Sequence, residues 1–380
     1  MPGSDNPPIN PPITATTGEL GDLCPRLWQG TDGRRGQRER SRIKLIAMTA
    51  LSPLSIGGLQ LESPVLLAPM AGYTDLPFRL TVRRLGGLGL AYSEMLSPHS
   101  ILQGRGKRRK EMLATNPEDK PLGYQLYGTD AGMMADAARW LQEQGAVVID
   151  INMGCPKRRI ACAGPGAGLL RNPLEAVRLA ERVVEAVSIP VTAKLRLGWD
   201  SRTFVAGDLA RDLERAGVAA ITIHGRTADQ GYRGEVDLDG IRRVAESVVS
   251  VPVIGNGDID SPAAALEMVE VTGCAGVMLG RGLTKDPWLA RDISRALAGL
   301  PALPPPSLSE RWREFRDLLE RTAGHHGEEK AAILFRKWIP PWASRLKIGR
   351  EGLLRLLKIP DLQTLRMALK ELEPDEGDAP

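Results

Sequence analysis

The chain has 380 residues and a mass of 41.2 kDa, enough to bury a large hydrophobic core. Hydrophobic residues make up 42% of it and charged residues 25%, which is typical of globular proteins and argues against a disordered or fibrous chain. The net charge is only +4, so charge alone neither requires nor excludes a polyanionic partner.

No segment approaches the roughly 18 consecutive apolar residues of a membrane helix, so we expect no membrane partner. The cysteines are too few and too scattered for a disulfide framework, and their spacing fits no metal site, so we expect no bound metal. They are Cys24, Cys155, Cys162 and Cys274. The N-terminus has no apolar stretch behind a basic start, which indicates no secretory signal and favours the cytoplasm.

Residues 1–52 are rich in Pro, Gly, Thr and Arg and have no hydrophobic period, so we expect a disordered or weakly ordered N-terminal extension. Over residues 53–300, short apolar runs alternate with amphipathic stretches. The runs are 65–70, 88–94, 122–127, 146–152, 191–196, 219–224, 252–256 and 275–280. Most are continuously apolar, as parallel strands buried on both faces are.

Signals for helix starts separate the apolar runs. Asn172, Pro173 and Glu175 predict an N-cap, a proline in the first turn and a capping box, and Ser261 with Pro262 repeats the cap and the proline. Eight strand and helix units predict an α/β fold, namely a (β/α)8 TIM barrel. An open dinucleotide-binding sheet would need a glycine fingerprint after its first strand, and residues 68–72 do not provide one.

Residues 301–307 form a proline-rich linker, and residues 308–372 have a helical period, so we expect a small helical domain after the barrel. An acidic tail follows at 373–380. Between 301 and 370 there are 14 Lys and Arg and 8 Asp and Glu, a basic surplus of 6. This surplus fits either a solvated helical face or a surface for a polyanion.

Polar residues follow the apolar runs at the ends where a TIM barrel carries its active site. They are Gln125, Asn152, Cys155, Lys194, Arg196, His224, Arg226, Asn256, Asp258 and Arg281. Residues 255–258 and 279–282 are also rich in glycine, so they expose backbone N–H groups beside a cation at the usual phosphate site of such barrels. The sequence therefore predicts a phosphorylated ligand, although these glycines could also serve only to make tight turns.

Two residues are candidates for chemistry. Lys194 stands in an apolar run, where an ammonium group is costly without a partner. It could form a Schiff base, hold the N1/O2 edge of a flavin, or make a structural salt bridge. Cys155 follows a strand end between Gly154 and Pro156, where its thiol could deliver a proton to carbon. A single cysteine is more often a small buried hydrophobic residue; we interpret Cys274 in that way and leave Cys162 open.

A set of motifs in the same order resembles the tRNA-dihydrouridine synthase family, and within it the bacterial B-type branch. The resemblance covers roughly residues 54 to 370. The motifs are Ala68-Pro69-Met70-Ala71-Gly72, Ser93-Glu94-Met95, Gln125-Leu126-Tyr127-Gly128, Asp150-Ile151-Asn152-Met153-Gly154-Cys155-Pro156, Lys194-Leu195-Arg196-Leu197-Gly198-Trp199, His224-Gly225-Arg226-Thr227, Asn256-Gly257-Asp258 and Gly280-Arg281.

The resemblance implies an enzyme that uses FMN, with NADPH or NADH as reductant, to reduce the C5=C6 bond of particular uridines in tRNA. It implies that Cys155 is the proton donor to C5. The positions that match the family's FMN contacts are Ala68, Pro69, Met70, Gln125, Lys194, His224, Asn256, Gly257, Asp258, Gly280 and Arg281. Those that match its substrate contacts are Asn152, Arg196 and Arg226 around the base and Arg336 and Lys337 in the helical domain.

The target uridine lies inside a folded tRNA, so the base must swing out, and the enzyme must hold phosphates elsewhere. We expect the helical domain and the basic run 105–110 to supply these contacts, and we expect a monomer. The sequence departs from the family pattern in two places. In residues 157–162, Cys162 stands where a basic residue is commoner, and in the helical domain Trp338 stands where the family usually has a histidine. These departures bear on which uridine is chosen.

Three other functions compete with this hypothesis. The first is an FMN barrel that acts on free pyrimidines, such as a dihydroorotate or dihydropyrimidine dehydrogenase, but a free base needs no basic helical domain. The second is a Schiff-base aldolase that uses Lys194. The third is an inert RNA-binding barrel, which the presence of both Cys155 and Lys194 disfavours.

Overall fold

A computed structural model describes residue 51 and residues 53–374, apart from the side chains of residues 107 and 108. Except for residue 51, the expected N-terminal extension at 1–52 lies outside the described residues, as does most of the expected acidic tail.

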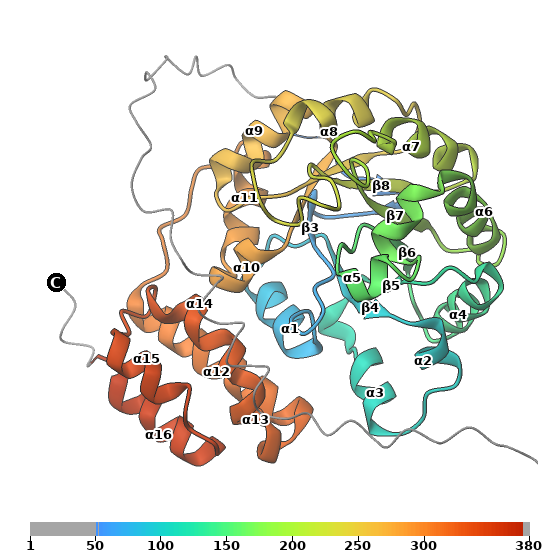
Figure 1. Ribbon diagram of the computed structural model, residues 1–380. Coiled ribbons are helices and arrows are strands. Elements are labelled where there is room, and N and C mark those ends of the chain that lie inside the picture. The colour runs from blue at the N-terminus through green and yellow to red at the C-terminus, as the bar shows by residue number, and fades with distance from the viewer. Residues whose placement is uncertain (1–50, 52, 375–380) are drawn as a thin grey trace, which may run out of the picture. The chain divides into compact units, whose positions relative to one another are not determined.

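The predicted TIM barrel is confirmed. Its strands are all parallel and close in the order β10-β3-β4-β5-β6-β7-β8-β9 (Figure 1). They are β3 (Val65–Leu67), β4 (Leu90–Leu96), β5 (Leu122–Leu126), β6 (Val148–Met153), β7 (Val191–Arg196), β8 (Ala220–His224), β9 (Val253–Asn256) and β10 (Gly276–Leu279). Each lies within a few residues of a predicted run, because a strand covered on both faces needs an unbroken apolar segment.

Amphipathic helices cover the outside of the barrel. They are α1 (Leu76–Leu85), α2 (Pro98–Leu102), α3 (Lys107–Leu113), η1 (Pro117–Asp119), α4 (Ala131–Glu143), α5 (Arg158–Ala161), η2 (Gly166–Arg171), α6 (Pro173–Val184), α7 (Ala206–Arg215), α8 (Leu238–Ala245), α9 (Pro262–Thr272), α10 (Arg281–Lys285) and α11 (Leu289–Leu297). Ser261 caps α9 as predicted, since its side chain accepts from the N–H of Ala264. The capping box predicted for α6 is wrong: the Asn172 side chain makes no capping bond, and Glu175 pairs with Arg178 instead.

A short hairpin, β1 (Ser55–Ile56) with β2 (Leu59–Gln60), precedes the barrel and was not predicted. Its flanking residues Leu54 and Leu61 are buried with side chains from inside the barrel, such as Ile254 and Met278. The turn at Gly57 lies against Pro190, just before β7. The hairpin therefore closes the amino-terminal end of the barrel.

The helical region after the linker packs against the barrel. Its elements are α12 (Leu308–His326), α13 (Glu328–Phe335), η3 (Arg336–Trp338), α14 (Ile339–Ala343), α15 (Arg350–Leu356) and α16 (Leu362–Leu372). Helix α12 lies against α1 (Figure 1). The ring of Trp338 lies 4.6 Å from that of Phe78 on α1, so the two regions share one hydrophobic core.

Candidate active site

The carboxyl ends of the strands bring predicted site residues to one end of the barrel. The pairing of β6 with β7 sets Lys194 beside Asn152. The pairing of β7, β8 and β9 sets Arg196, His224 and Asn256 in one row. Because these positions lie on neighbouring strands, their side chains form a single cluster at the open end of the barrel.

Cys155 lies in the loop after β6, and its backbone is held on both sides. Its N–H donates to Oδ1 of Asn152 at 2.9 Å, and its carbonyl accepts from the N–H of Ala167 at 3.1 Å. The carbonyl of the preceding Gly154 accepts from Nε of Arg196 at 2.8 Å. The Cys155 side chain is free and only half-buried, so its thiol is accessible on a fixed backbone.

A buried chain of hydrogen bonds runs beneath this loop. Nδ2 of Asn152 donates to Oε1 of Gln125 at 2.7 Å, and Nε2 of Gln125 donates to Oδ2 of Asp150 at 2.6 Å. The hydroxyl of Thr192 donates to the other oxygen of Asp150 at 2.6 Å. Burial raises the pKa of Asp150 to about 6, so its carboxyl is mostly ionised at neutral pH. Gln125 is completely buried, below the surface of the cluster.

Lys194 finds an amide partner. Its Nζ donates to Oδ1 of Asn256 at 2.7 Å, and Nδ2 of Asn256 donates to the carbonyl of Met278 at 2.7 Å. Burial lowers the pKa of Lys194 to about 8, against the opposing effect of a negative charge on Asp150 or Cys155. The ammonium is therefore present at neutral pH and can accommodate a further anionic or electron-rich group.

His224 stands among these cations as a neutral imidazole. Burial lowers its pKa well below 6.5, and the positive charges of Lys194 and Arg196 lower it further. A Cβ at Gly257 would lie 2.9 Å from the His224 ring, so only glycine lets this loop approach it. The ring can offer one donor and one acceptor without adding charge.

Arg196 is buried and holds loops at the open end of the barrel. Its Nη1 donates to the carbonyls of Thr227 and Gly231, both at 2.8 Å, in addition to its bond to Gly154. Burial lowers the pKa of Arg196 to about 10, so it remains charged. The guanidinium fixes the loops around the cluster, and its predicted contact with a base stays a prediction.

Arg226 is also buried, and it links the loop after β8 to the loop after β9. It donates to the carbonyl of Gly234 at 2.6 Å and forms an ion pair with Asp258. Arg281 pairs with the same carboxylate at 3.0 Å and lies 4.3 Å above the ring of Tyr232. Tyr232 is 58% exposed and was not predicted as a site residue, because an isolated tyrosine in a loop carries no pattern.

The first loop of the barrel lies next to the last one. The N–H of Ala68 donates to the carbonyl of Leu279 at 2.7 Å. A Cβ at Gly280 would lie 3.5 Å from the sulfur of Met70 and 3.8 Å from the Cβ of Ala68. The stretch Ala68, Pro69 and Met70 and the loop after β10 therefore border the same space.

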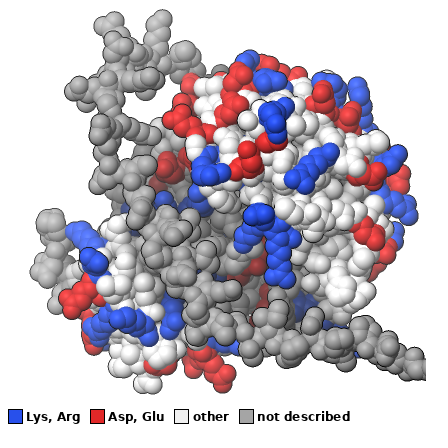
Figure 2. Space-filling view, viewed as in Figure 1, with Lys and Arg blue, Asp and Glu red and all other residues white. Residues whose placement is uncertain are grey.

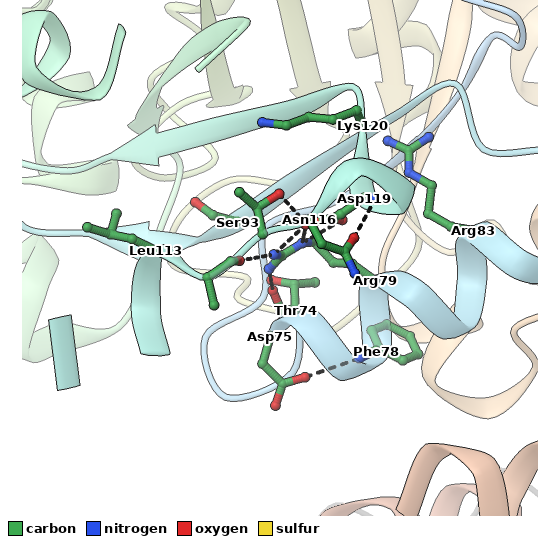
Figure 3. Close-up of polar contacts among 12 residues, drawn as sticks. Thr74, Asp75, Phe78, Arg79, Arg83, Ser93, Leu113, Asn116, Asp119 and Lys120 are labelled. Atoms are coloured by element: carbon green, nitrogen blue, oxygen red, sulfur yellow. Dashed lines mark hydrogen bonds and ion pairs between the residues drawn. The ribbon is translucent and has the colours of Figure 1, made fainter. Parts of the chain in front are cut away.

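A buried ion pair that was not predicted holds this first loop (Figure 3). Arg79 on α1 binds both oxygens of Asp119, with the shortest distance at 2.7 Å, and both side chains are almost fully buried. Its Nη1 donates to the carbonyl of Thr74 at 2.6 Å, and the Thr74 hydroxyl accepts from the N–H of Met70 at 3.0 Å. The pair therefore fixes the loop from below.

The two basic residues predicted in the helical region lie at or near its contact with the barrel. Nζ of Lys337 donates to Oδ2 of Asp75 at 3.1 Å, and His326 contacts the same oxygen. Nη2 of Arg336 donates to the carbonyl of Ile359 within the helical region at 3.1 Å. Lys337 thus joins the two regions at the start of α1, and contacts of either residue with a substrate stay predictions.

The described residues include no helix long and apolar enough to cross a membrane. They also include no group of three His, Cys, Asp or Glu side chains placed to hold a metal ion. The arrangement instead offers an ammonium, a neutral imidazole, glycine-rich loops and an accessible thiol around one space. Such a set suits a planar, partly anionic ligand that carries a phosphate, with a proton donor beside it.

Comparison with known proteins gives consistent matches. The family model described as Dihydrouridine synthase (Dus) matches residues 66–347. A probable tRNA-dihydrouridine synthase of Rhodobacter capsulatus is 46% identical over 246 residues, which are 65% of this chain and 75% of that protein. The tRNA-dihydrouridine synthase B of Pseudomonas aeruginosa is 38% identical over 307 residues, 79% of this chain and 90% of that protein.

Solved structures share the fold at low sequence identity. A 2-naphthoyl-CoA reductase complex is 13% identical with a TM-score of 0.52, and it covers 66% of this chain. A histamine dehydrogenase from Rhizobium sp. 4-9 is 14% identical with a TM-score of 0.50, and it covers 72% of this chain. This chain spans about half of each of them, 52% and 51%, so these two likenesses concern the barrel fold alone.

Proposed function

The chain belongs to the dihydrouridine synthase family, and we propose that it reduces the C5=C6 bond of specific uridines in tRNA with FMN as its cofactor and NADPH or NADH as reductant. It is a tRNA-dihydrouridine synthase, a flavin-dependent oxidoreductase. The main support for this proposed mechanism is the half-buried Cys155. Hydrogen bonds fix its backbone, and its side chain lies near the Lys194 ammonium.

The residues present fit a flavin mononucleotide. Lys194 would face the N1/O2 edge of the ring, because among the described residues its ammonium donates a hydrogen bond only to the amide oxygen of Asn256. The glycine-rich loops at 256–258 and 280–281 would hold the phosphate. Ala68, Pro69 and Met70 border the same space, whereas Gln125 would act from below through Asn152. When bound, the reduced flavin supplies a hydride to C6 of the uracil.

Cys155 holds the proton that C5 then needs. As negative charge develops across C5 and the C4 carbonyl, the Cys155 thiol gives its proton to C5, and the resulting thiolate is reprotonated from solvent. One hydride and one proton then complete the dihydrouridine.

Exposed cations provide contacts for the tRNA backbone. Lys157, Arg158 and Arg159 directly follow the Cys155 loop and are all exposed. In the helical region, which we propose as the tRNA-binding domain at 308–372, Lys347 and Arg350 are exposed and form no ion pair with any described residue. Figure 2 shows basic and acidic side chains side by side on this region, so only some of its Lys and Arg side chains are free to bind phosphate.

Two further proposals follow from the substrate. Free thiols at Cys155, Cys162 and Cys274 fit a reducing compartment, and we place the enzyme in the cytoplasm. We also propose that it acts as a monomer, because residues for each step come from one barrel.

The test is reduction of an unmodified tRNA by the purified, flavin-loaded protein with NADPH. We expect a yellow protein, and mass spectrometry should find particular uridines heavier by two hydrogen atoms. Reduction of free uracil or orotate without any change in the tRNA would instead favour an enzyme of free pyrimidines.

A further inference from the structure

The hydrogen bonds below the catalytic loop run in a fixed direction from Asp150 to the backbone of Cys155. Asp150 accepts from Gln125, Gln125 accepts from Asn152, and Asn152 accepts from the N–H groups of Gly154 and Cys155. The two bonds at the end of the chain are 3.2 and 2.9 Å long. Asp150 therefore reaches the Cys155 loop through two side-chain amides.

The direction depends on the chemistry of the first member. An ionised carboxylate can only accept hydrogen bonds, whereas a side-chain amide can present either its oxygen or its NH2 group to a neighbour. Because Asp150 accepts, Gln125 must turn its NH2 group inward and its oxygen toward Asn152. Asn152 must then turn its own oxygen toward the two backbone N–H groups.

The direction is fixed at both ends of the chain, because Asp150 can only accept and the N–H groups of Gly154 and Cys155 can only donate. If Gln125 turned over, it would present NH2 to the NH2 group of Asn152, and Asn152 could relieve this only by turning its NH2 group toward the N–H of Cys155. Two donors would then face each other below the loop, and buried donors without acceptors are costly. Asp150 has no exposed surface, and its other oxygen accepts a hydrogen bond from Thr192.

We propose that Asp150 is a positioning residue that orients the amides of Gln125 and Asn152 and so fixes the backbone that presents the Cys155 thiol. Its significance for catalysis rests on the proposed role of Cys155 as proton donor. The effect of Asp150 on the loop backbone does not depend on that role, so an experiment can refute the positioning role and the proton-donor role separately.

The experiment measures hydrogen exchange of the Gly154 and Cys155 backbone amides in the full, flavin-loaded chain at about pH 8. Asp150→Ala removes the acceptor, and loss of one oriented hydrogen bond should speed exchange at both amides about five- to tenfold. Asp150→Asn keeps an oxygen for Gln125, because the Thr192 hydroxyl can rotate to accept from the new NH2 group. In this variant, the exchange rates of the Gly154 and Cys155 amides should stay within about twofold of those in the parent.

Thr192→Val is the matched control. It removes the other hydrogen bond to the same carboxylate at nearly constant volume and leaves the bond to Gln125 in place. Exchange at Gly154 and Cys155 should stay within about twofold of the parent, while exchange in β7 and β8 reports any general loss of stability in each variant.

Unchanged exchange at the two amides in a folded Asp150→Ala protein would overturn the proposal, as would an equal effect of Thr192→Val. Where Asp150→Ala does not fold, Asp150→Leu replaces it, because leucine also removes the acceptor but fills more of the space, and it should speed exchange at the two amides to the same extent. Normal dihydrouridine formation by a Cys155→Ala protein would refute the proposed role of Cys155 as proton donor and leave the result on the loop standing.

Discussion

The cations of the candidate active site have two different kinds of partner. Among the described residues, the Lys194 ammonium donates a hydrogen bond only to an amide oxygen, which fits its proposed contact with an electron-rich ligand. Arg196 and Arg226 use their guanidinium groups on backbone carbonyls and on Asp258. A buried arginine that holds several carbonyls fixes loop geometry more firmly than any single amide could.

Replacement of Cys155 by alanine should abolish most of the turnover. General acid catalysis is worth about 10²- to 10⁴-fold, so dihydrouridine formation should fall by that factor. Flavin content and tRNA affinity should stay close to those of the parent, because the Cys155 backbone bonds do not involve its side chain. Near-normal turnover would exclude Cys155 as the proton donor, and Cys162→Ala is the matched control at an exposed thiol.

Flavin retention should depend on pH through Lys194. The ammonium form favours an electron-rich ligand, and the pKa of this group is lowered to about 8, so affinity should be constant below pH 8 and fall above it. Ultrafiltration with flavin fluorescence measures the effect.

Lys194→Met should bind flavin more weakly at every pH and lose this dependence. Thiols also titrate in this range, so Cys155→Ser, which should keep the dependence, separates the two groups. A variant at Lys194 with the same pH profile as the parent would contradict the assignment.

The sequence could predict that these polar residues gather at one end of the barrel, but it could not predict several of their hydrogen-bond partners. Polar residues after strand ends identify the open end of the barrel, because parallel strands all end there. The Asn152 amide bonds to Gln125 and to the Cys155 loop. These bonds depend on the directions of side chains on separate strands. No spacing in the sequence encodes those directions.

At the scale of elements, continuous apolar runs predicted the strands well, while polar contacts between elements escaped prediction. The hairpin at 55–60 is too short to show a period. Arg79 and Asp119 are separated by 40 positions, and a lone arginine in a helix is usually solvated. The fold class could therefore be derived, whereas the ion pair that fixes the first loop could not.

Removal of Arg79 should destabilise the fold strongly. Arg79→Ala leaves Asp119 buried and unpaired, which typically costs about 3 to 5 kcal/mol of the free energy of unfolding. Arg84→Ala is the matched control, because Arg84 lies on the same helix and pairs with Glu118 at the surface, where such pairs contribute less than about 1 kcal/mol. Urea unfolding measures both, and equal losses would contradict this account.

At the scale of the whole described chain, the linker at 301–307 does not separate two independent cores. Aromatic side chains of the helical region, such as Trp338, pack directly on α1 of the barrel. Lys337 and His326 meet at Asp75, the N-cap of the same helix. Any contact that the helical region makes with tRNA is therefore coupled mechanically to the loop at 68–75.

Neutralising the basic residues beside the catalytic loop should reduce the salt dependence of tRNA binding. For every phosphate that a variant no longer binds, the slope of log affinity against log salt should decrease by about one. We expect Lys157→Ala, Arg158→Ala and Arg159→Ala together to flatten the slope.

The control removes three positive charges at Arg178, Arg182 and Arg211 on the outer helices α6 and α7, where each arginine pairs with an acidic residue. This control should leave the slope unchanged. Filter binding at several salt concentrations gives the slopes, and equal slopes for both triple variants would refute the proposed contact.

Among the described residues, the hairpin covers the amino-terminal end of the barrel, so the polar cluster lies at the opposite, open end. We expect the nicotinamide and the uracil to reach the cofactor from this end one after the other, so that the first departs before the second arrives. Steady-state rates should accordingly follow a ping-pong pattern, with parallel lines in double-reciprocal plots. Oxidised nicotinamide should compete with the tRNA for the reduced enzyme. The rate of dihydrouridine formation in the cell should therefore fall as the ratio of oxidised to reduced nicotinamide rises.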